Sequence, residues 1–175
     1  RSAHDSSIRV PMALCGPGFD GGGRLRQMVS LVDVAPTLLD AAGLPVSDEM
    51  QGRSFLPLVG GRSTPWPDDI FIQYSESADG RAVRTRRWKY AVEAPQPARR
   101  EGPAPERYAE ACLYDLEADP HELNNLIGYA SCRAVADAMR ARLVRRMIEA
   151  GEAEPVIVPA PGKRSGQHRV RPEDM

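Results

Sequence analysis

Two short runs that favour β-strands flank a two-residue turn in the stretch that decides the fold, Arg81-Ala82-Val83-Arg84-Thr85-Arg86-Arg87-Trp88-Lys89-Tyr90-Ala91-Val92. The two runs, 81–85 and 88–92, predict an antiparallel hairpin. The turn pair lacks the Asn-Gly chemistry of common hairpins, so the type of turn stays open. Alternation along the chain places Arg84 and Arg86 on the side of Trp88 and Tyr90, and the other basic residues on the opposite side.

Two further strands are predicted outside the hairpin. Residues 70–74 and 113–116 are short runs of apolar and aromatic side chains, and the structure-breaking residues around them favour strands over helices. Residues 95–108 are rich in Pro, Arg and Glu, which predicts an exposed, poorly ordered loop. The centre of the chain is therefore expected to form a small antiparallel sheet.

A long amphipathic helix is predicted over residues 132–150. Its apolar positions recur at a spacing of four, at Val135, Met139, Leu143 and Met147. A second helix start is expected at 119–122, where Asp, Pro and Glu follow in the order of a capped first turn.

The first third of the chain has the pattern of an α/β unit. Residues 8–15 and 28–32 are predicted strands, and the first is apolar enough for burial on both faces. Asp33 is expected to cap a helix that ends at Gly43, a residue that favours a left-handed helix end. A boundary falls in the Pro- and Gly-rich residues 57–69.

These elements predict an α/β chain, or more narrowly an α+β fragment. Residues 1–60 are assigned to the end of an α/β domain. Residues 61–155 are assigned to a subdomain with an antiparallel sheet and a helix, and residues 156–175 to a flexible tail.

Composition excludes several functional classes. The 23 basic and 24 acidic residues give a net charge of -1, which argues against nucleic acid or an anionic membrane as a partner. No apolar run reaches the roughly 20 residues of a membrane span. The three cysteines have long gaps and no CxxC spacing, so neither a disulfide framework nor a zinc site is expected.

No group of side chains in the sequence has the spacing of a known metal or nucleophile motif. The histidines His4, His121 and His168 lie far apart, and no Ser-His-Asp arrangement can be assembled. The glycines before Arg24 are better explained by a surface loop than by a backbone loop that binds an anion. Acidic residues at 115–122 lack the ligand spacing of a calcium loop. The basic residues of the hairpin fit two readings, a wall facing an anionic substrate or a solvated sheet edge.

Seven segments in order resemble the sulfatases of the alkaline phosphatase superfamily. The resemblance covers nearly the whole chain to about residue 126. It rests on Ser7-Ile8-Arg9-Val10-Pro11, Gly16-Pro17-Gly18, Val29-Ser30-Leu31-Val32-Asp33-Val34-Ala35-Pro36-Thr37-Leu38-Leu39, Gln51-Gly52-Arg53-Ser54, Arg81-Ala82-Val83-Arg84-Thr85, Trp88-Lys89-Tyr90 and Leu113-Tyr114-Asp115-Leu116-Glu117-Ala118-Asp119-Pro120.

The resemblance implies a larger enzyme whose chemistry lies upstream of this chain. In that family a formylglycine, made from Cys or Ser in a C/S-x-P-x-R motif, and a bound calcium act on a sulfate ester. The metal-binding segment precedes the segment at residues 7–11, and an active-site Lys commonly precedes residue 1. Cys15 fits the start of the nucleophile motif, but Phe19 stands where Arg is required. We therefore assign no catalytic residue and no metal ligand to this chain.

The expected role is the C-terminal part of a sulfate-ester hydrolase, inactive without the missing N-terminal catalytic domain. Gln73, Glu76 and Arg84 lie at strand ends beside a loop and are predicted to line the substrate pocket. The implied substrate is a sulfated small molecule or glycan. Two alternatives stay open: a non-catalytic anion-binding or assembly module, and a phosphonate or phosphodiester hydrolase of the same superfamily.

Overall fold

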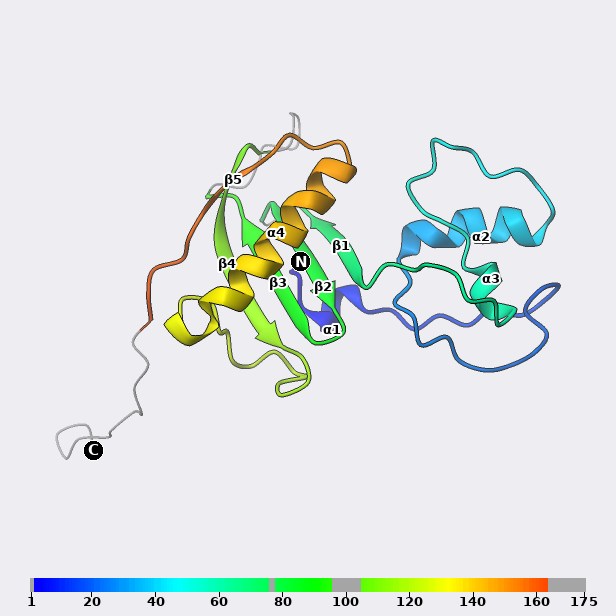
Figure 1. The fold of residues 1–175 in the computed structure, drawn as a ribbon, viewed down its shortest axis with the longest axis horizontal. Coiled ribbons are helices and arrows are strands. Elements are labelled where there is room, and N and C mark those ends of the chain that lie inside the picture. The colour runs from blue at the N-terminus through cyan, green and yellow to red at the C-terminus, as the bar shows by residue number, and fades with distance from the viewer. Residues whose placement is uncertain (1, 76–77, 96–104, 164–175) are drawn as a thin grey trace.

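A five-stranded sheet with one long helix across it forms the larger part of the computed structural model (Figure 1). The structure describes residues 2–75, 78–95 and 105–163. A second part lies beside strand β1 and carries the helices α2 and α3 (Figure 1). The predicted class, a mixed α/β chain with a small antiparallel sheet and a C-terminal helix, is confirmed.

The strands follow one another in the order of the chain. They are β1 (Asp69–Tyr74), β2 (Gly80–Thr85), β3 (Trp88–Glu93), β4 (Arg107–Asp115) and β5 (Val156–Val158). Strands β1 to β4 pair antiparallel, whereas β5 pairs parallel to β4. The predicted strand at 70–74 and the predicted hairpin are both confirmed, and the strand expected at 113–116 is the end of the longer β4.

Helix α4 (Arg133–Glu149), preceded by the single turn η2 (Ala130–Cys132), covers one face of the sheet (Figure 1). Its buried side chains Ala136, Met139, Leu143 and Met147 recur at helical spacing, which confirms the predicted helix. They pack on apolar side chains of the sheet, namely Val83, Tyr90, Val92, Tyr108, Leu113 and Ile157.

Buried ion pairs fix the position of α4 on the sheet. The Asp69 side chain is fully buried and accepts hydrogen bonds from Arg142, Arg145 and Arg146. Near the start of α4, Arg133 binds the fully buried Glu110 side chain through its two terminal nitrogens, Nη1 at 2.8 Å and Nη2 at 2.6 Å. Two carboxylates of the sheet therefore anchor the helix along its length.

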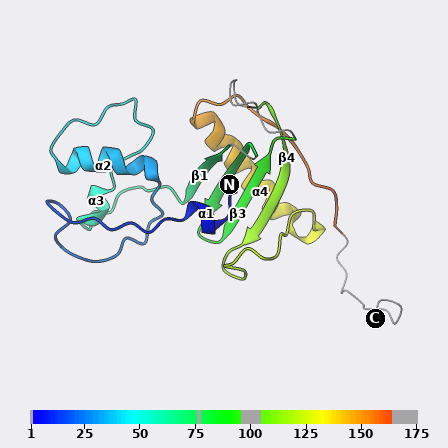
Figure 2. The ribbon, with the colours of Figure 1, turned by 180° about the vertical axis from the view of Figure 1, so that it is seen from behind.

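The opposite face of the sheet carries the N-terminal segment (Figure 2). This segment includes the single-turn helix α1 (Asp5–Ile8). The apolar contacts beneath it are small, because they come from Ala3, Tyr74, Ala82 and Ala91. The two faces of the sheet thus differ in apolar area: ion pairs add to a large core under α4, whereas the apolar cluster under the N-terminal segment is small.

The part beside β1 is built around α2 (Val34–Ala41), which the turn η1 (Leu31–Asp33) precedes, and α3 (Leu56–Val59). Asp33 stands at the predicted start of the helix. Its carboxylate, however, accepts from the backbone N–H of Ser30 at 2.9 Å and of Arg53 at 3.0 Å. Gly43 has the expected left-handed conformation after the helix, with φ of 69°.

The two strands predicted in the first third of the chain are wrong. Residues 9–15 form neither helix nor strand, and residues 28–32 end in the turn η1. A strand needs the backbone groups of a neighbour, and no described segment pairs with either run. Their apolar side chains are accordingly exposed, including Val10 at 54%, Leu31 at 66% and Val32 at 55%.

Three predictions in the second half also need correction. Residues 119–122 form turns rather than a helix start, and Glu122 adopts a left-handed φ of 58°. Strand β4 begins at Arg107, inside the predicted loop, while residues 96–104 of that loop lie outside the described residues. Strand β5 falls within the predicted tail, of which residues 164–175 are likewise not described.

The predicted division of the basic residues between the faces of the hairpin is wrong for Arg84 and for Arg81, which pairs with Val92 and therefore lies on the face of Tyr90. Strand register pairs Arg84 with Lys89 and Val83 with Tyr90, so Arg84 lies on the face opposite Tyr90. The prediction continued the alternation through the turn, although cross-strand partners share a face, and this places the residues of β2 on the wrong face relative to those of β3.

Candidate functional site at the N-terminal junction

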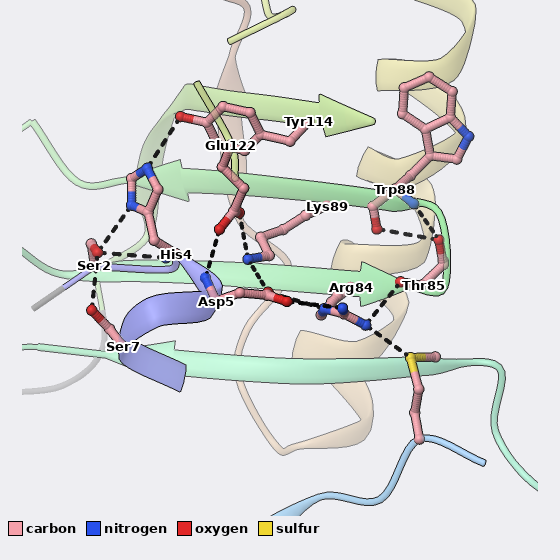
Figure 3. Close-up of polar contacts among 11 residues, drawn as sticks. Ser2, His4, Asp5, Ser7, Arg84, Thr85, Trp88, Lys89, Tyr114 and Glu122 are labelled. Carbon is pink, nitrogen blue, oxygen red and sulfur yellow. Dashed lines mark hydrogen bonds and ion pairs between the residues drawn. The ribbon is translucent and has the colours of Figure 1, made fainter. Parts of the chain in front are cut away.

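The N-terminal segment is attached to the sheet through Asp5 (Figure 3). The guanidinium of Arg84 donates to its carboxylate from Nε at 3.1 Å and from Nη2 at 2.9 Å. The ammonium of Lys89 donates to Asp5 Oδ1 at 2.5 Å. Arg84 and Lys89 are register partners on β2 and β3, so one carboxylate bridges two adjacent strands.

Lys89 is the centre of a buried cluster of charges. Its side chain is fully buried, and Nζ also donates to Glu122 Oε1 at 2.5 Å. The second oxygen of Glu122 accepts the backbone N–H of Asp5 at 2.6 Å. Glu122 thus holds both Lys89 and the segment that Lys89 binds, and its left-handed backbone places the carboxylate between them (Figure 3).

The cluster is balanced in charge. Asp5 and Glu122 carry two negative charges against the two positive charges of Arg84 and Lys89. Burial alone would raise the pKa of the Asp5 carboxyl, but the hydrogen bonds from Arg84 and Lys89 outweigh it and hold that pKa below its ordinary value. These four groups are therefore satisfied by one another and leave no free charge for a ligand.

His4 makes a second attachment beside Asp5. Its Nδ1 lies 3.0 Å from Ser2 Oγ, and its Nε2 lies 3.3 Å from the Tyr114 hydroxyl on β4. The His4 and Tyr114 rings are also in contact, with centroids 5.6 Å apart. Both nitrogens of the imidazole thus have partners within the chain.

A cavity of about 460 Å³ lies between this segment and the end of the β1–β2 hairpin at which the chain connects the two strands. Ser2 and Ser7 form one wall, on either side of Asp5 in sequence, and Gln73, Ser75 and Arg81 belong to the other. Ile8, Tyr74 and Asp79 complete the lining, so the cavity carries hydroxyl, amide and guanidinium groups together with a carboxylate and an apolar side chain.

Glu152 lies behind the second wall of this cavity. Its Oε1 accepts from Gln73 Nε2 at 2.5 Å and from Arg81 Nε at 2.7 Å. Its Oε2 is buried without a hydrogen-bond partner among the described residues. Gln73 and Arg81 are thus held in place by a carboxylate that follows α4.

The structure places two of the three predicted pocket residues. Gln73 and Arg84 both line a larger cavity of about 700 Å³ between the N-terminal segment, residues 25–31 and β1. Gln73 is exposed and also lines the smaller cavity, whereas Arg84 is half-buried against Asp5. Glu76 lies outside the described residues.

The remaining candidate residues are used in structural contacts or are isolated. Across residues 2–75, 78–95 and 105–163, no group of three His, Cys, Asp or Glu side chains could hold a metal ion. In the acidic stretch, Asp115 binds Arg87 at 2.8 Å and Asp119 accepts the Asn124 backbone N–H at 2.7 Å. His121 is exposed, and His168 is not described. No described helix is long and apolar enough to cross a membrane.

The basic residues of the hairpin are engaged with carboxylates. Arg81 binds Glu152, Arg84 and Lys89 bind Asp5, and Arg87 binds Asp115. Arg86 instead donates to a backbone oxygen, that of Arg26 at 2.9 Å. This pairing weakens the interpretation of the hairpin as an anion-binding wall.

Sequence reasoning missed the cluster of Asp5, Lys89 and Glu122. One signal was available, because Lys89 stands between Trp88 and Tyr90 in the middle of a predicted strand. A lysine is rarely fully buried unless it is paired, so such a position calls for acidic partners. The partners themselves are 84 and 33 residues away in sequence, where no local pattern points to them.

Comparison with known proteins gives consistent matches. Residues 1–149 match the family model described as N-sulphoglucosamine sulphohydrolase, C-terminal. The chain is 34% identical over 140 residues to arylsulfatase K of Homo sapiens, covering 71% of this chain and 23% of that protein. It is 34% identical over 128 residues to choline-sulfatase of Rhizobium meliloti (strain 1021), covering 70% of this chain and 22% of that protein.

A solved structure of a 2-O GAG sulfatase shares the fold, with a TM-score of 0.56 and 26% sequence identity. That match covers 68% of this chain and 24% of the solved one. The chain thus spans less than a quarter of the length of the curated relatives named above.

Proposed function

Because the chain belongs to the N-sulphoglucosamine sulphohydrolase C-terminal family of sulfatases, we propose that it works as the C-terminal part of an enzyme that cleaves sulfate esters. Residues 1–60 complete the catalytic domain in this proposal, and residues 61–155 form the C-terminal subdomain. The observation that carries it is the cavity at the N-terminal junction, where residues of both parts form opposite walls.

Exposed apolar side chains support the proposal that another part of the polypeptide packs against residues 10–50. Most large apolar side chains with high exposure fall in this range, among them Met12, Leu31, Val32, Leu38 and Leu44. Exposed apolar side chains gathered in one stretch of the chain favour a contact with another protein surface. A catalytic domain that supplies neighbours for residues 8–15 and 28–32 would bury them.

The substrate is a sulfated small molecule or glycan, and this chain contributes pocket wall rather than reacting groups. The Gln73 amide and the Arg81 guanidinium supply N–H donors to the smaller cavity, and sulfate oxygens are acceptors. Arg84 lines the larger cavity while its guanidinium binds Asp5, so within the proposed set Gln73, Glu76 and Arg84 it acts as a wall residue rather than as a free charge.

Family membership implies formylglycine and calcium for the complete enzyme. A calcium site needs six to eight oxygen ligands, and the described residues bring no such set together. In this proposal both groups are held outside the described residues. The role of this chain is to shape and orient, by hydrogen bonds and by exclusion of water.

The test compares the 175-residue chain with the longer protein encoded in frame with its upstream sequence. The longer protein should hydrolyse p-nitrophenyl sulfate and lose that activity when the Cys or Ser of a C/S-x-P-x-R motif is changed to Ala. The chain alone should show no turnover with calcium present. Turnover by the chain alone would refute the proposal. So would a longer protein that cleaves only phosphonate or phosphodiester substrates.

The pocket wall is tested separately in the longer protein. Gln73→Ala should raise KM for a sulfated substrate several-fold, because it removes a donor from the wall of both cavities. Gln27→Ala is a control of the same chemistry, since Gln27 lines the larger cavity but not the smaller one. Equal effects of the two changes would count against a role for the smaller cavity.

A further inference from the structure

We propose that Lys89 is a positioning residue: through Asp5 and Glu122 it fixes the wall formed by Ser2 and Ser7, and so sets the width of the adjoining cavity. This inference rests on the proposed function, because it assigns the cavity to an extended sulfated substrate. Lys89 itself does not line the cavity and acts only through the segment that it holds.

The N-terminal segment depends on tertiary contacts for its conformation. Helix α1 has four residues, too few to be stable alone. Its apolar contacts are few, since Ala3 is the one buried apolar side chain that the described part of the segment contributes to the cluster on this face. Polar contacts must therefore fix it, and those of Asp5 are the most buried among them.

Lys89 organises those contacts. It binds the Asp5 carboxylate directly, and it binds Glu122, whose other oxygen holds the Asp5 backbone N–H. The side chain and the backbone of one residue are thus fixed by a single buried cation. When the Lys89 ammonium is lost, the buried Glu122 carboxylate has no cation next to it. The Glu122 side chain must then move toward water.

Displacement at Asp5 is transmitted directly to the cavity. Ser2 lies three residues before Asp5 and Ser7 two residues after it, and both line the cavity. The opposite wall does not depend on this contact, because Glu152 holds Gln73 and Arg81. A shift of one wall alone changes the width of the cavity.

The experiment uses Lys89→Met in the longer protein, with Arg146→Met as a matched control. Arg146 binds the fully buried Asp69 on the other face of the sheet, and Arg142 and Arg145 remain as partners when it is removed. Likewise, Arg84 remains for Asp5 when Lys89 is removed. Lys89→Met removes one of two cations from Asp5 and the cation bound to Glu122, whereas Arg146→Met removes one of three cations from Asp69; only the first change concerns the cavity.

The readout is the ratio of kcat/KM for sulfated glycosaminoglycan disaccharides to kcat/KM for p-nitrophenyl sulfate. This ratio does not depend on how much of the enzyme is folded, so a loss of stability alone leaves it unchanged. Lys89→Met should lower the ratio about tenfold, because only the larger substrate spans the cavity. Arg146→Met should leave it within about twofold.

Hydrogen exchange of residues 2–8 in the 175-residue chain gives a second measurement. Lys89→Met should remove the protection of this segment, and Asp5→Asn, which keeps the side-chain volume, should do the same. The inference is overturned if the segment keeps its protection, or if protection is lost while the substrate ratio stays unchanged. If the longer protein cleaves no sulfate ester, the proposed function is refuted. The hydrogen-exchange measurement still decides in that case whether Lys89 holds the Ser2 and Ser7 wall.

Discussion

Glu110→Gln offers a sharp test of how α4 is held on the sheet. The Glu110 carboxylate is fully buried and accepts two hydrogen bonds from Arg133, one from the Tyr90 hydroxyl at 3.1 Å and one from the Ala160 backbone N–H at 2.9 Å. Glutamine keeps the volume but replaces one acceptor with a donor. Whichever oxygen it replaces, that donor then faces an Arg133 guanidinium nitrogen, which can only donate.

The cost follows from these contacts. A hydrogen bond to a charged group contributes about 1.5–3 kcal/mol, and a buried donor left without a partner costs a further 1–3 kcal/mol or so. Arg133 is 35% exposed and keeps Asp137 at 2.8 Å, so its charge is not stranded. We therefore expect the free energy of unfolding to fall by about 3 kcal/mol.

Urea denaturation of the 175-residue chain measures this change. Asp137→Asn is the control, because Asp137 binds the same arginine while 58% exposed and should contribute at most about 0.5 kcal/mol. A loss below about 1 kcal/mol for Glu110→Gln, or equal losses for both variants, would refute this account.

The same change has a defined pH dependence. Burial raises the pKa of Glu110, but the contacts of Arg133, Ala160 and Tyr90 outweigh it, so the folded pKa lies below the reference value of 4.5. The stabilisation is therefore complete above pH 4.5 and is lost as the pH falls through the folded pKa. The gap in stability between the native chain and Glu110→Gln should narrow over that range.

Three further changes test separate parts of the structure. Gly52→Ala should destabilise the chain by about 2–3 kcal/mol in thermal denaturation, because the new Cβ would lie 1.9 Å from the Val32 carbonyl oxygen, which is backbone. Leu143→Ala should cost about 3 kcal/mol in urea denaturation, since this fully buried side chain leaves a cavity between α4 and the sheet. Cys15 should react with a thiol reagent in the folded chain, whereas Cys112, whose pKa burial raises to about 12, should react only after unfolding.

Helices and strands that a short stretch of sequence is enough to indicate could be predicted. The hairpin joins two consecutive strands, and α4 has apolar side chains at helical spacing within its own length, so a short stretch of sequence is enough to indicate each. The runs at 8–15 and 28–32 have the composition of strands, but pairing depends on a neighbour, and the described residues supply none. Strand β5 was missed because three residues carry no periodic signal and their partner in β4 lies about 50 residues earlier.

The site was predicted less completely than the fold. Gln73 and Arg84 are near cavities, as strand-end residues beside loops often are. The cluster around Lys89 joins three segments that are distant in sequence. At Glu122 the sequence indicated a helix start, because an acid three positions after a cap has that pattern. The structure uses this carboxylate for a tertiary contact instead, with a backbone conformation that few residues other than glycine adopt.

The difference between the two faces of the sheet explains why charged groups gather beside the cavity. On the face of α4, Val83, Tyr90 and Leu113 offer large apolar areas that hold the helix in addition to its ion pairs with Asp69 and Glu110. On the other face, Ala82 and Ala91 allow the N-terminal segment to approach closely but provide little apolar area. Hydrogen-bonded charges can supply the missing attraction, and their distance and angle requirements define one position. Hydrogen-bonded ion pairs therefore fix the position of the Ser2 and Ser7 wall more closely than the small apolar contacts on this face.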